Sequence, residues 1–247
     1  MYVVYALLMI IFHPLFLYPF GDEAFSDARF EPFTVEGAQI QVRGLNDDAP
    51  AVLYFMGNGG ALAYFRGYLQ VHLNSGRGVV AKEYPGGGGI SGAPSESRLK
   101  AQALASYDWL AAEHDGPIVL HGYSMGTGLA LYVAANRPVD GVILDAPYAR
   151  MCDLMTTSSW LPACYLPGVQ RWNSAALADD IQVPVLILHG DADQMIPLEH
   201  GQKLADVLLQ RNVDVEMQVF QAAQHHNLVI QPRYAGEVGQ FIERVIR

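Results

Sequence analysis

A serine flanked by glycines, where a strand-like segment meets a helix-like one, constrains the fold more than any other part of the chain. Residues 118–120 form a branched apolar run typical of a buried strand. They lead into the pentapeptide GYSMG at 122–126, and residues 127–136 have the composition of a helix. In this context a Gly-x-Ser-x-Gly turn lifts the serine hydroxyl clear of a sheet. Ser124 is therefore a candidate nucleophile.

Strand-like and helix-like segments alternate along the rest of the chain. After a hairpin over 33–43, the patterns predict strands at 51–55, 78–84, 118–120, 139–144, 183–188 and 213–220, with helices between them and a closing helix over 234–247. Such alternation predicts an α/β fold with one mostly parallel sheet of about eight strands and helices on both faces. Loops at the carboxyl ends of the strands are then expected to hold the functional site.

Composition narrows the classes of partner. A chain of 247 residues with 51% hydrophobic residues can build one large core, which we expect over residues 21–247. The net charge of −10 argues against nucleic acid and against an anionic membrane surface. Cys152 and Cys164 lack metal-ligand spacing, and either a disulfide in an exported protein or two free thiols fits them. The sequence leaves the oligomeric state open.

The first twenty residues contain no Lys, Arg, Asp or Glu. This length suits an apolar membrane span of roughly 20 residues, so we expect residues 1–20 to anchor the protein in a membrane. His13-Pro14 interrupts the segment, and the missing basic n-region disfavours a cleaved signal peptide. The alternative is an apolar arm, packed on the domain or mediating oligomerisation, in a soluble cytoplasmic or periplasmic protein.

A nucleophilic serine needs two partners. Its hydroxyl is unreactive at neutral pH without an adjacent base, and the base needs an orienting carboxylate. In the loop after the strand at 183–188, Asp193 is the first choice for the carboxylate and Asp191 the second. After the last strand stand two adjacent histidines, His225 and His226, of which at most one can be the base. The chain order Ser, Asp, His is that of the α/β-hydrolases.

Acyl transfer also needs N–H donors for the oxyanion of the tetrahedral intermediate. One donor is expected from the backbone of Met125, the residue after the nucleophile, and the other from the loop at 56–60. In that loop Asn58 is the first choice and Gly59 the competitor. The glycine run at 86–89 lacks both a following Lys-Ser/Thr and GxGxxG spacing, so nucleotide binding is not expected. No cofactor and no metal site are indicated.

Beyond these local patterns, nearly the whole chain after Phe30 resembles the α/β-hydrolase superfamily. The matching segments are YFMGNGG at 54–60, EYPGGGGISGAPSE at 83–96, GYSMG at 122–126, WNSAALADDIQVPVLILHGDADQMIP at 172–197 and QAAQHHN at 221–227. Within the superfamily the chain is most similar to small-capped, often membrane-anchored serine hydrolases, including bacterial exported esterases and eukaryotic protein depalmitoylases. Met56 departs from the usual histidine. Gapless matching places His225 on the family's base and preserves the loop length from the strand, so His225 is the first choice, whereas matching His-Asn would select His226.

The resemblance implies hydrolysis of carboxylic esters or thioesters through an acyl-serine intermediate, without a cofactor. It also implies that residues 150–180 form a short cap, whose aromatic residues and prolines suit a small-molecule or lipid-like substrate with an apolar acyl group. Three alternatives remain on the same scaffold: a serine peptidase, a lysophospholipase and a non-catalytic binding protein.

Overall fold

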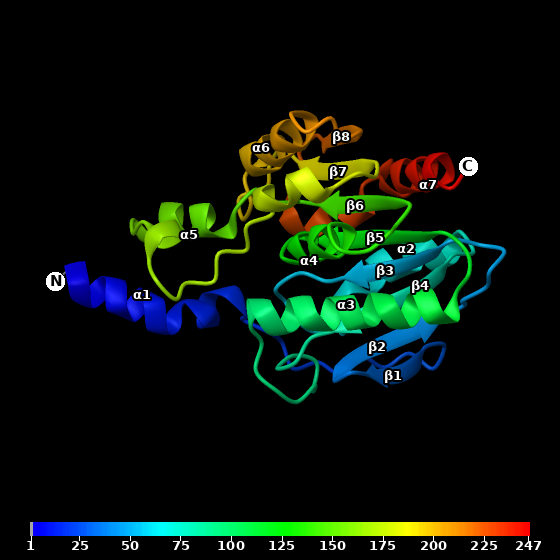
Figure 1. Ribbon diagram of the computed structural model, residues 1–247, viewed down its shortest axis with the longest axis horizontal. Helices are drawn as coiled ribbons and strands as arrows, with labels where there is room; N and C mark the ends of the chain where they lie inside the picture. Colours follow the sequence, from blue (N-terminus) through cyan, green and yellow to red (C-terminus); the bar gives the residue numbers. More distant parts are fainter. Residues whose placement is uncertain (1) are drawn as a thin grey trace.

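An eight-stranded sheet runs through the molecule, with strand order β1-β2-β4-β3-β5-β6-β7-β8 (Figure 1). The computed structural model describes residues 2–247. The strands are β1 (Glu31–Val35), β2 (Ala38–Arg43), β3 (Ala51–Phe55), β4 (Gly78–Glu83), β5 (Ile118–Tyr123), β6 (Gly141–Asp145), β7 (Val185–Gly190) and β8 (Val215–Phe220). β2 pairs antiparallel with β1 and β4, and the other pairs are parallel. The predicted mostly parallel sheet of about eight strands is confirmed.

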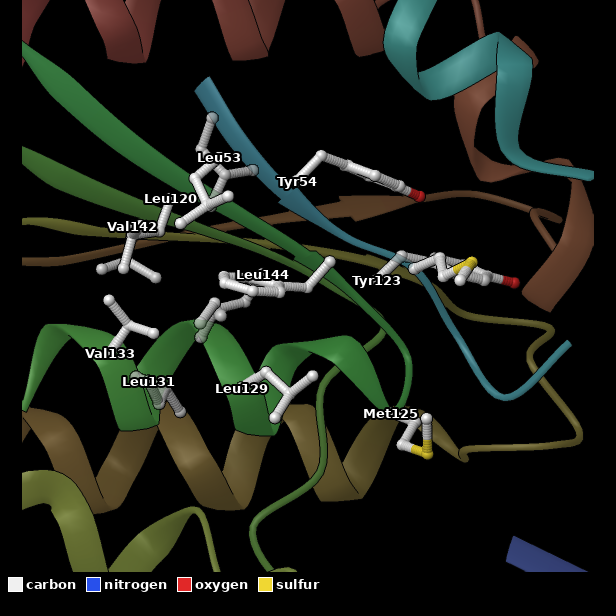
Figure 2. Packing of buried hydrophobic residues seen from close by; sticks show 14 of the residues in the cluster. Leu53, Tyr54, Leu120, Tyr123, Met125, Leu129, Leu131, Val133, Val142 and Leu144 are labelled. Carbon is white, nitrogen blue, oxygen red and sulfur yellow. The ribbon is translucent and has the colours of Figure 1, made fainter. Parts of the chain in front are cut away.

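Helices cover both faces of the sheet. One face carries α2 (Arg66–Asn74) and α7 (Tyr234–Val245), and the other carries α3 (Glu96–Glu113), α4 (Gly126–Ala134) and α6 (Leu198–Leu209). Figure 2 shows Leu129 and Val133 of α4 below Val142 and Leu144 of β6, while Tyr54 lies on the opposite face. Because both faces are covered, β3 to β7 are buried at every position, which explains the apolar runs with which these strands begin.

The segment at 150–180, expected to form a short cap, is built from short helical pieces. It contains helix α5 (Met151–Ser159) and the short 3₁₀ turns η2 (Ala163–Tyr165) and η3 (Ala175–Asp180). A disulfide joins Cys152 in α5 to Cys164 in η2. Of the two predicted states, a disulfide or two free thiols, the structure contains the disulfide. The bridge ties the two sides of the cap together.

Helix α1 (Tyr2–Leu17) projects from the same end of the molecule as α5 (Figure 1). The hydroxyl of Tyr5 donates to the carbonyl of Ser159 at 3.1 Å, and His13 Nε2 accepts from the backbone N–H of Gln170 at 3.1 Å. These are the contacts of an apolar arm packed on the domain. Among residues 2–247 no helix combines the length and the apolar character needed to cross a membrane. The span predicted over 1–20 is therefore not found there.

The turn from β5 into α4 is held by close backbone packing. Ser124 adopts a left-handed φ of 53°, which is uncommon for a residue with a side chain. A Cβ on Gly126 would lie 2.1 Å from the carbonyl oxygen of Phe55, and one on Gly122 would lie 2.5 Å from that of Gly126. The two glycines are thus required by the close approach of β3 and of the turn itself.

Replacing Gly126 by alanine is expected to lower the free energy of unfolding by about 3 kcal/mol, because the new methyl group would overlap rigid backbone. The matched control is Gly236→Ala in α7, where nothing lies within 4 Å of the added Cβ. That control should be stabilising by about 0.5–1 kcal/mol, because alanine favours a helix more than glycine does. Urea unfolding of both variants measures the two effects, and equal stability of the two would contradict this account.

Candidate active site

Ser124, Asp193 and His225 come from the loops after β5, β7 and β8 and meet at the carboxyl edge of the sheet. His225 Nε2 lies 3.0 Å from Ser124 Oγ, and His225 Nδ1 lies 2.6 Å from Asp193 Oδ2. All three residues are at most 5% exposed. With the proton on Nδ1, the imidazole donates to the carboxylate and its Nε2 accepts from the serine hydroxyl. The structure thus joins the three first-choice residues in one hydrogen-bonded chain.

The loop after β7 keeps Asp193 ionised. Its Oδ1 accepts from the backbone N–H groups of Met195 at 2.8 Å and Ile196 at 2.9 Å. Burial alone would raise the pKa of Asp193, but the hydrogen bond from His225, the charge on that histidine and the two backbone donors outweigh it and hold the pKa below its usual value. The carboxylate therefore remains an acceptor for His225.

The second-choice residues lie outside this chain. Asp191 Oδ1 accepts from the backbone N–H of Ala222 at 2.6 Å, so it ties the loop after β7 to the turn after β8. The ring of His226 is exposed, and its Nδ1 is 3.5 Å from the hydroxyl of Tyr123. The same hydroxyl donates to the backbone carbonyl of His225 at 2.9 Å, which positions that residue. Sequence reasoning missed Tyr123, although it lies inside the GYSMG motif.

The two expected oxyanion donors belong to segments next to Ser124: Met125 follows it in the chain, and Asn58 is in the loop after β3. Asn58 lines the same cavity as Ser124 and His225, and a Cβ on Gly57 would lie 3.2 Å from the Cβ of Ser124. Within residues 2–247 no backbone carbonyl accepts a hydrogen bond from the N–H of Met125 or of Asn58. Asn58 lines the cavity and Gly59 does not, so Asn58 fits the expected role better than Gly59.

A cavity of about 640 Å³ opens above Ser124. Besides the residues already described, its walls are apolar and come from α1, from α5 and from the loop after β7, and they include Leu8, Phe12, Phe16, Leu154, Met155 and Met195. No Lys, Arg, Asp or Glu lines it. Sequence reasoning expected the cap to form a wall but assigned α1 to a membrane, because its apolar composition suits either environment.

Comparison with known proteins identifies the group to which this site belongs. Residues 90–237, which include Ser124, Asp193 and His225, match the family model of the dienelactone hydrolase family. The chain belongs to this family. Membership makes it a hydrolase, and the resemblance to the α/β-hydrolase superfamily is thereby confirmed.

Relatives of this dienelactone hydrolase family member support the assignment. It is 31% identical over 210 residues to Protein ABHD12B from Homo sapiens, covering 75% of this chain and 58% of that protein. It is 31% identical over 194 residues to the lysophosphatidylserine lipase ABHD12 from Danio rerio, covering 70% of this chain and 51% of that protein. The chain thus spans between half and three fifths of these curated relatives. An esterase of Pyrococcus furiosus shares the fold with a TM-score of 0.73 at 17% identity, covering 92% of this chain and 97% of that one.

The cap brings together three side chains with the types of atom that can bind a metal. Among residues 2–247 this is the single group of that kind, made of Cys152, Asp153 and Cys164. Both sulfurs belong to the disulfide, so neither is available as a thiolate ligand. The cluster cannot hold a metal in this state.

A buried polar network lies beneath the candidate nucleophile of this family member. His72 Nε2 is 2.8 Å from His121 Nδ1, and His121 Nε2 is 2.8 Å from Asp145 Oδ2, which also accepts from the hydroxyl of Tyr234. All four side chains are inaccessible to solvent. The backbone carbonyl of Asp145 accepts from the N–H of Ser124 at 2.8 Å, so the network supports the turn from below. No sequence pattern indicated it.

Lowering the pH is expected to destabilise the fold through His72. Burial, followed by the nearby His121 and Arg77, holds the pKa of His72 well below its ordinary value of 6.5. Below pH 6.5 the unfolded chain therefore binds a proton that the folded chain does not. The free energy of unfolding should fall by up to about 1.4 kcal/mol per pH unit for this one group.

Urea unfolding at pH 7.5, 6.5 and 5.5 measures this dependence. The comparison is His72→Gln, which removes the titrating ring and leaves an amide that can still donate to His121. Its stability should fall less steeply with pH, and a slope equal to that of the wild type would refute the assignment to His72.

Proposed function

We propose that this hydrolase cleaves carboxylic esters or thioesters through an acyl-serine intermediate. The observation that carries the proposal is the hydrogen-bonded chain of Ser124, His225 and Asp193, which opens into an apolar cavity. A hydroxyl, a base and an orienting carboxylate in this order are the parts that nucleophilic acyl transfer needs.

In the first half of the reaction, Ser124 Oγ attacks the carbonyl carbon while His225 Nε2 takes the serine proton. Asp193 stabilises the imidazolium that forms and keeps it oriented. The oxyanion accepts from the backbone N–H groups of Met125 and Asn58, and losing one such donor costs about 10²–10³ in rate. The tetrahedral intermediate collapses when His225 returns the proton to the leaving alcohol or thiol, which leaves the acyl group on Ser124.

In the second half, a water molecule gives a proton to His225 and attacks the acyl-serine carbonyl. The same two N–H groups hold the second oxyanion. The carbon–Oγ bond then breaks and His225 returns the proton to Ser124, which releases the carboxylic acid. The side chains described above are sufficient for every proton transfer in this sequence.

The cavity favours a substrate with an apolar acyl group. Its uncharged walls and volume of about 640 Å³ suit an alkyl chain, since ligand pockets commonly measure about 300–1,000 Å³. A lysophospholipid is a second candidate substrate, because one relative is named a lysophosphatidylserine lipase and its acyl chain would occupy the same cavity. The apolar cavity favours an acyl ester over a peptide as substrate, and the hydrogen bond between Ser124 and His225 favours a catalytic over a binding role.

A fluorophosphonate probe tests whether Ser124 is activated. The wild type should be labelled, and Ser124→Ala should not be, because the probe reacts only with an activated serine hydroxyl. Circular dichroism of the variant establishes that it is folded. A folded wild type that takes up no label would favour the non-catalytic binding role.

The two adjacent histidines should differ sharply in kcat with p-nitrophenyl butyrate as substrate. His225→Ala is expected to lower kcat about 10⁴-fold or more, because it removes the base. His226→Ala, an exposed site with no contact to Ser124, should stay within about threefold of the wild type. Equal mild losses in both variants would contradict the assignment of His225 as the base.

A further inference from the structure

The outer face of α1 and the tip of the cap form one exposed apolar surface, which we call the apolar rim. It lies at the end of the molecule from which α1 and α5 project (Figure 1), and its exposed members are Val4, Leu7, Ile11, Leu15, Trp160 and Tyr165. Trp160 is 90% exposed, Tyr165 81% and Leu15 69%. None of the six lines the cavity, so they are not explained by the proposed site. A helix that is apolar on all sides is normally covered on all sides, but α1 is covered on one side only.

The rim is also free of charge. Residues 1–21 and 154–170 contain no Lys, Arg, Asp or Glu, in a chain whose net charge is −10. Charged residues lie where each of these segments meets the rest of the domain. Asp22 comes soon after α1. At the base of the cap, Asp153 forms ion pairs with Arg150 at 2.7 Å and with Lys203 at 3.3 Å. The uncharged end is therefore bounded by a charged border.

Trp160 cannot be explained by packing within the fold. It ends α5 in a left-handed conformation with φ 60°, an uncommon position for a large side chain, and its ring makes almost no contact with the protein. Trp and Tyr are enriched where one end of a side chain meets hydrocarbon and the other meets water. Trp160 and Tyr165 occupy such a place at the tip of the cap.

We propose that the apolar rim docks on the surface of a zwitterionic lipid bilayer, with α1 lying along the interface. Docking through buried apolar side chains needs no basic residues, and the rim has none. The negative net charge disfavours an anionic surface. A second copy of the chain is the less suitable occupant, because the rim lies beside the cavity along α1 and a protein seated there would cover the cavity entrance.

The rim and the cavity use adjacent faces of the same helix. Leu8, Phe12 and Phe16 line the cavity, whereas Ile11 and Leu15 belong to the rim. A docked molecule would therefore present the entrance of its cavity to the lipid, so that an acyl chain passes from the bilayer to Ser124 without crossing water. This last step rests on the proposed function, whereas docking itself does not.

Flotation with phosphatidylcholine vesicles tests the docking surface. The wild type should float with the vesicles equally in 0.1 and 1 M NaCl. The double variant Leu15→Ser/Trp160→Ser should bind at least tenfold more weakly. The control is Leu209→Ser, which changes a 52% exposed leucine at the far end of α6, and it should float like the wild type. Both variants should hydrolyse soluble p-nitrophenyl acetate at the wild-type rate.

Several outcomes would overturn the proposal. They are a wild type that stays in the dense fractions, a rim variant that floats as well as the wild type, and flotation that requires an anionic lipid. Sedimentation analysis without lipid covers the remaining case: a stable wild-type dimer that the rim variant loses would assign the rim to a second copy. Ser124→Ala should still float, so loss of docking and failure of the proposed chemistry give different results.

Discussion

The carbonyl oxygen of Phe55 lies where a side chain on Gly126 would have to be, and the geometry of the site depends on this close approach. It lets the turn after β5 pass directly over the end of β3. Ser124 is thereby held in a left-handed conformation, with its N–H bound to the carbonyl of Asp145. The hydroxyl is pushed out of the sheet toward the loops after β7 and β8. Strain in this turn is balanced by the packed backbone around it.

The site then combines rigid polar positioning with an adaptable apolar wall. The polar side of the site is held at several points. Asp193 accepts from two backbone N–H groups, and the hydroxyl of Tyr123 donates to the backbone carbonyl of His225. The cavity wall consists mostly of leucine, methionine and phenylalanine side chains from α1 and α5, and the hydrogen bond from Tyr5 to Ser159 links the two helices there. Methionine adapts readily to the shape of a neighbour. The polar half suits one reaction geometry, and the apolar half suits a range of acyl chains.

Sequence reasoning succeeded where a local pattern has a single physical solution. Unbroken apolar runs predicted the buried strands, and the GYSMG turn predicted the position of Ser124 at the edge of the sheet. Long-range contacts have no such signature, so the hydrogen bond from Tyr123 to His225 was missed. The same holds for the network of His72 and His121 below the turn. The packing of helix α1 on the cap was not foreseen either, because an apolar segment without charge suits lipid and protein alike and its hydrogen bonds to residues 159 and 170 have no local signature.

Because of the disulfide in the cap, the structure depends on the redox conditions in which the chain folds. Cys152 and Cys164 are only 12 residues apart, yet the loop that they close carries Leu154 and Met155 of the cavity wall. Closing a loop of this size stabilises a fold by about 3 kcal/mol in the chain-entropy account. A reducing cytoplasm would leave the two thiols separate and the wall less firmly held. Whether the chain folds in an oxidising or a reducing compartment therefore decides how firmly this wall of the cavity is held.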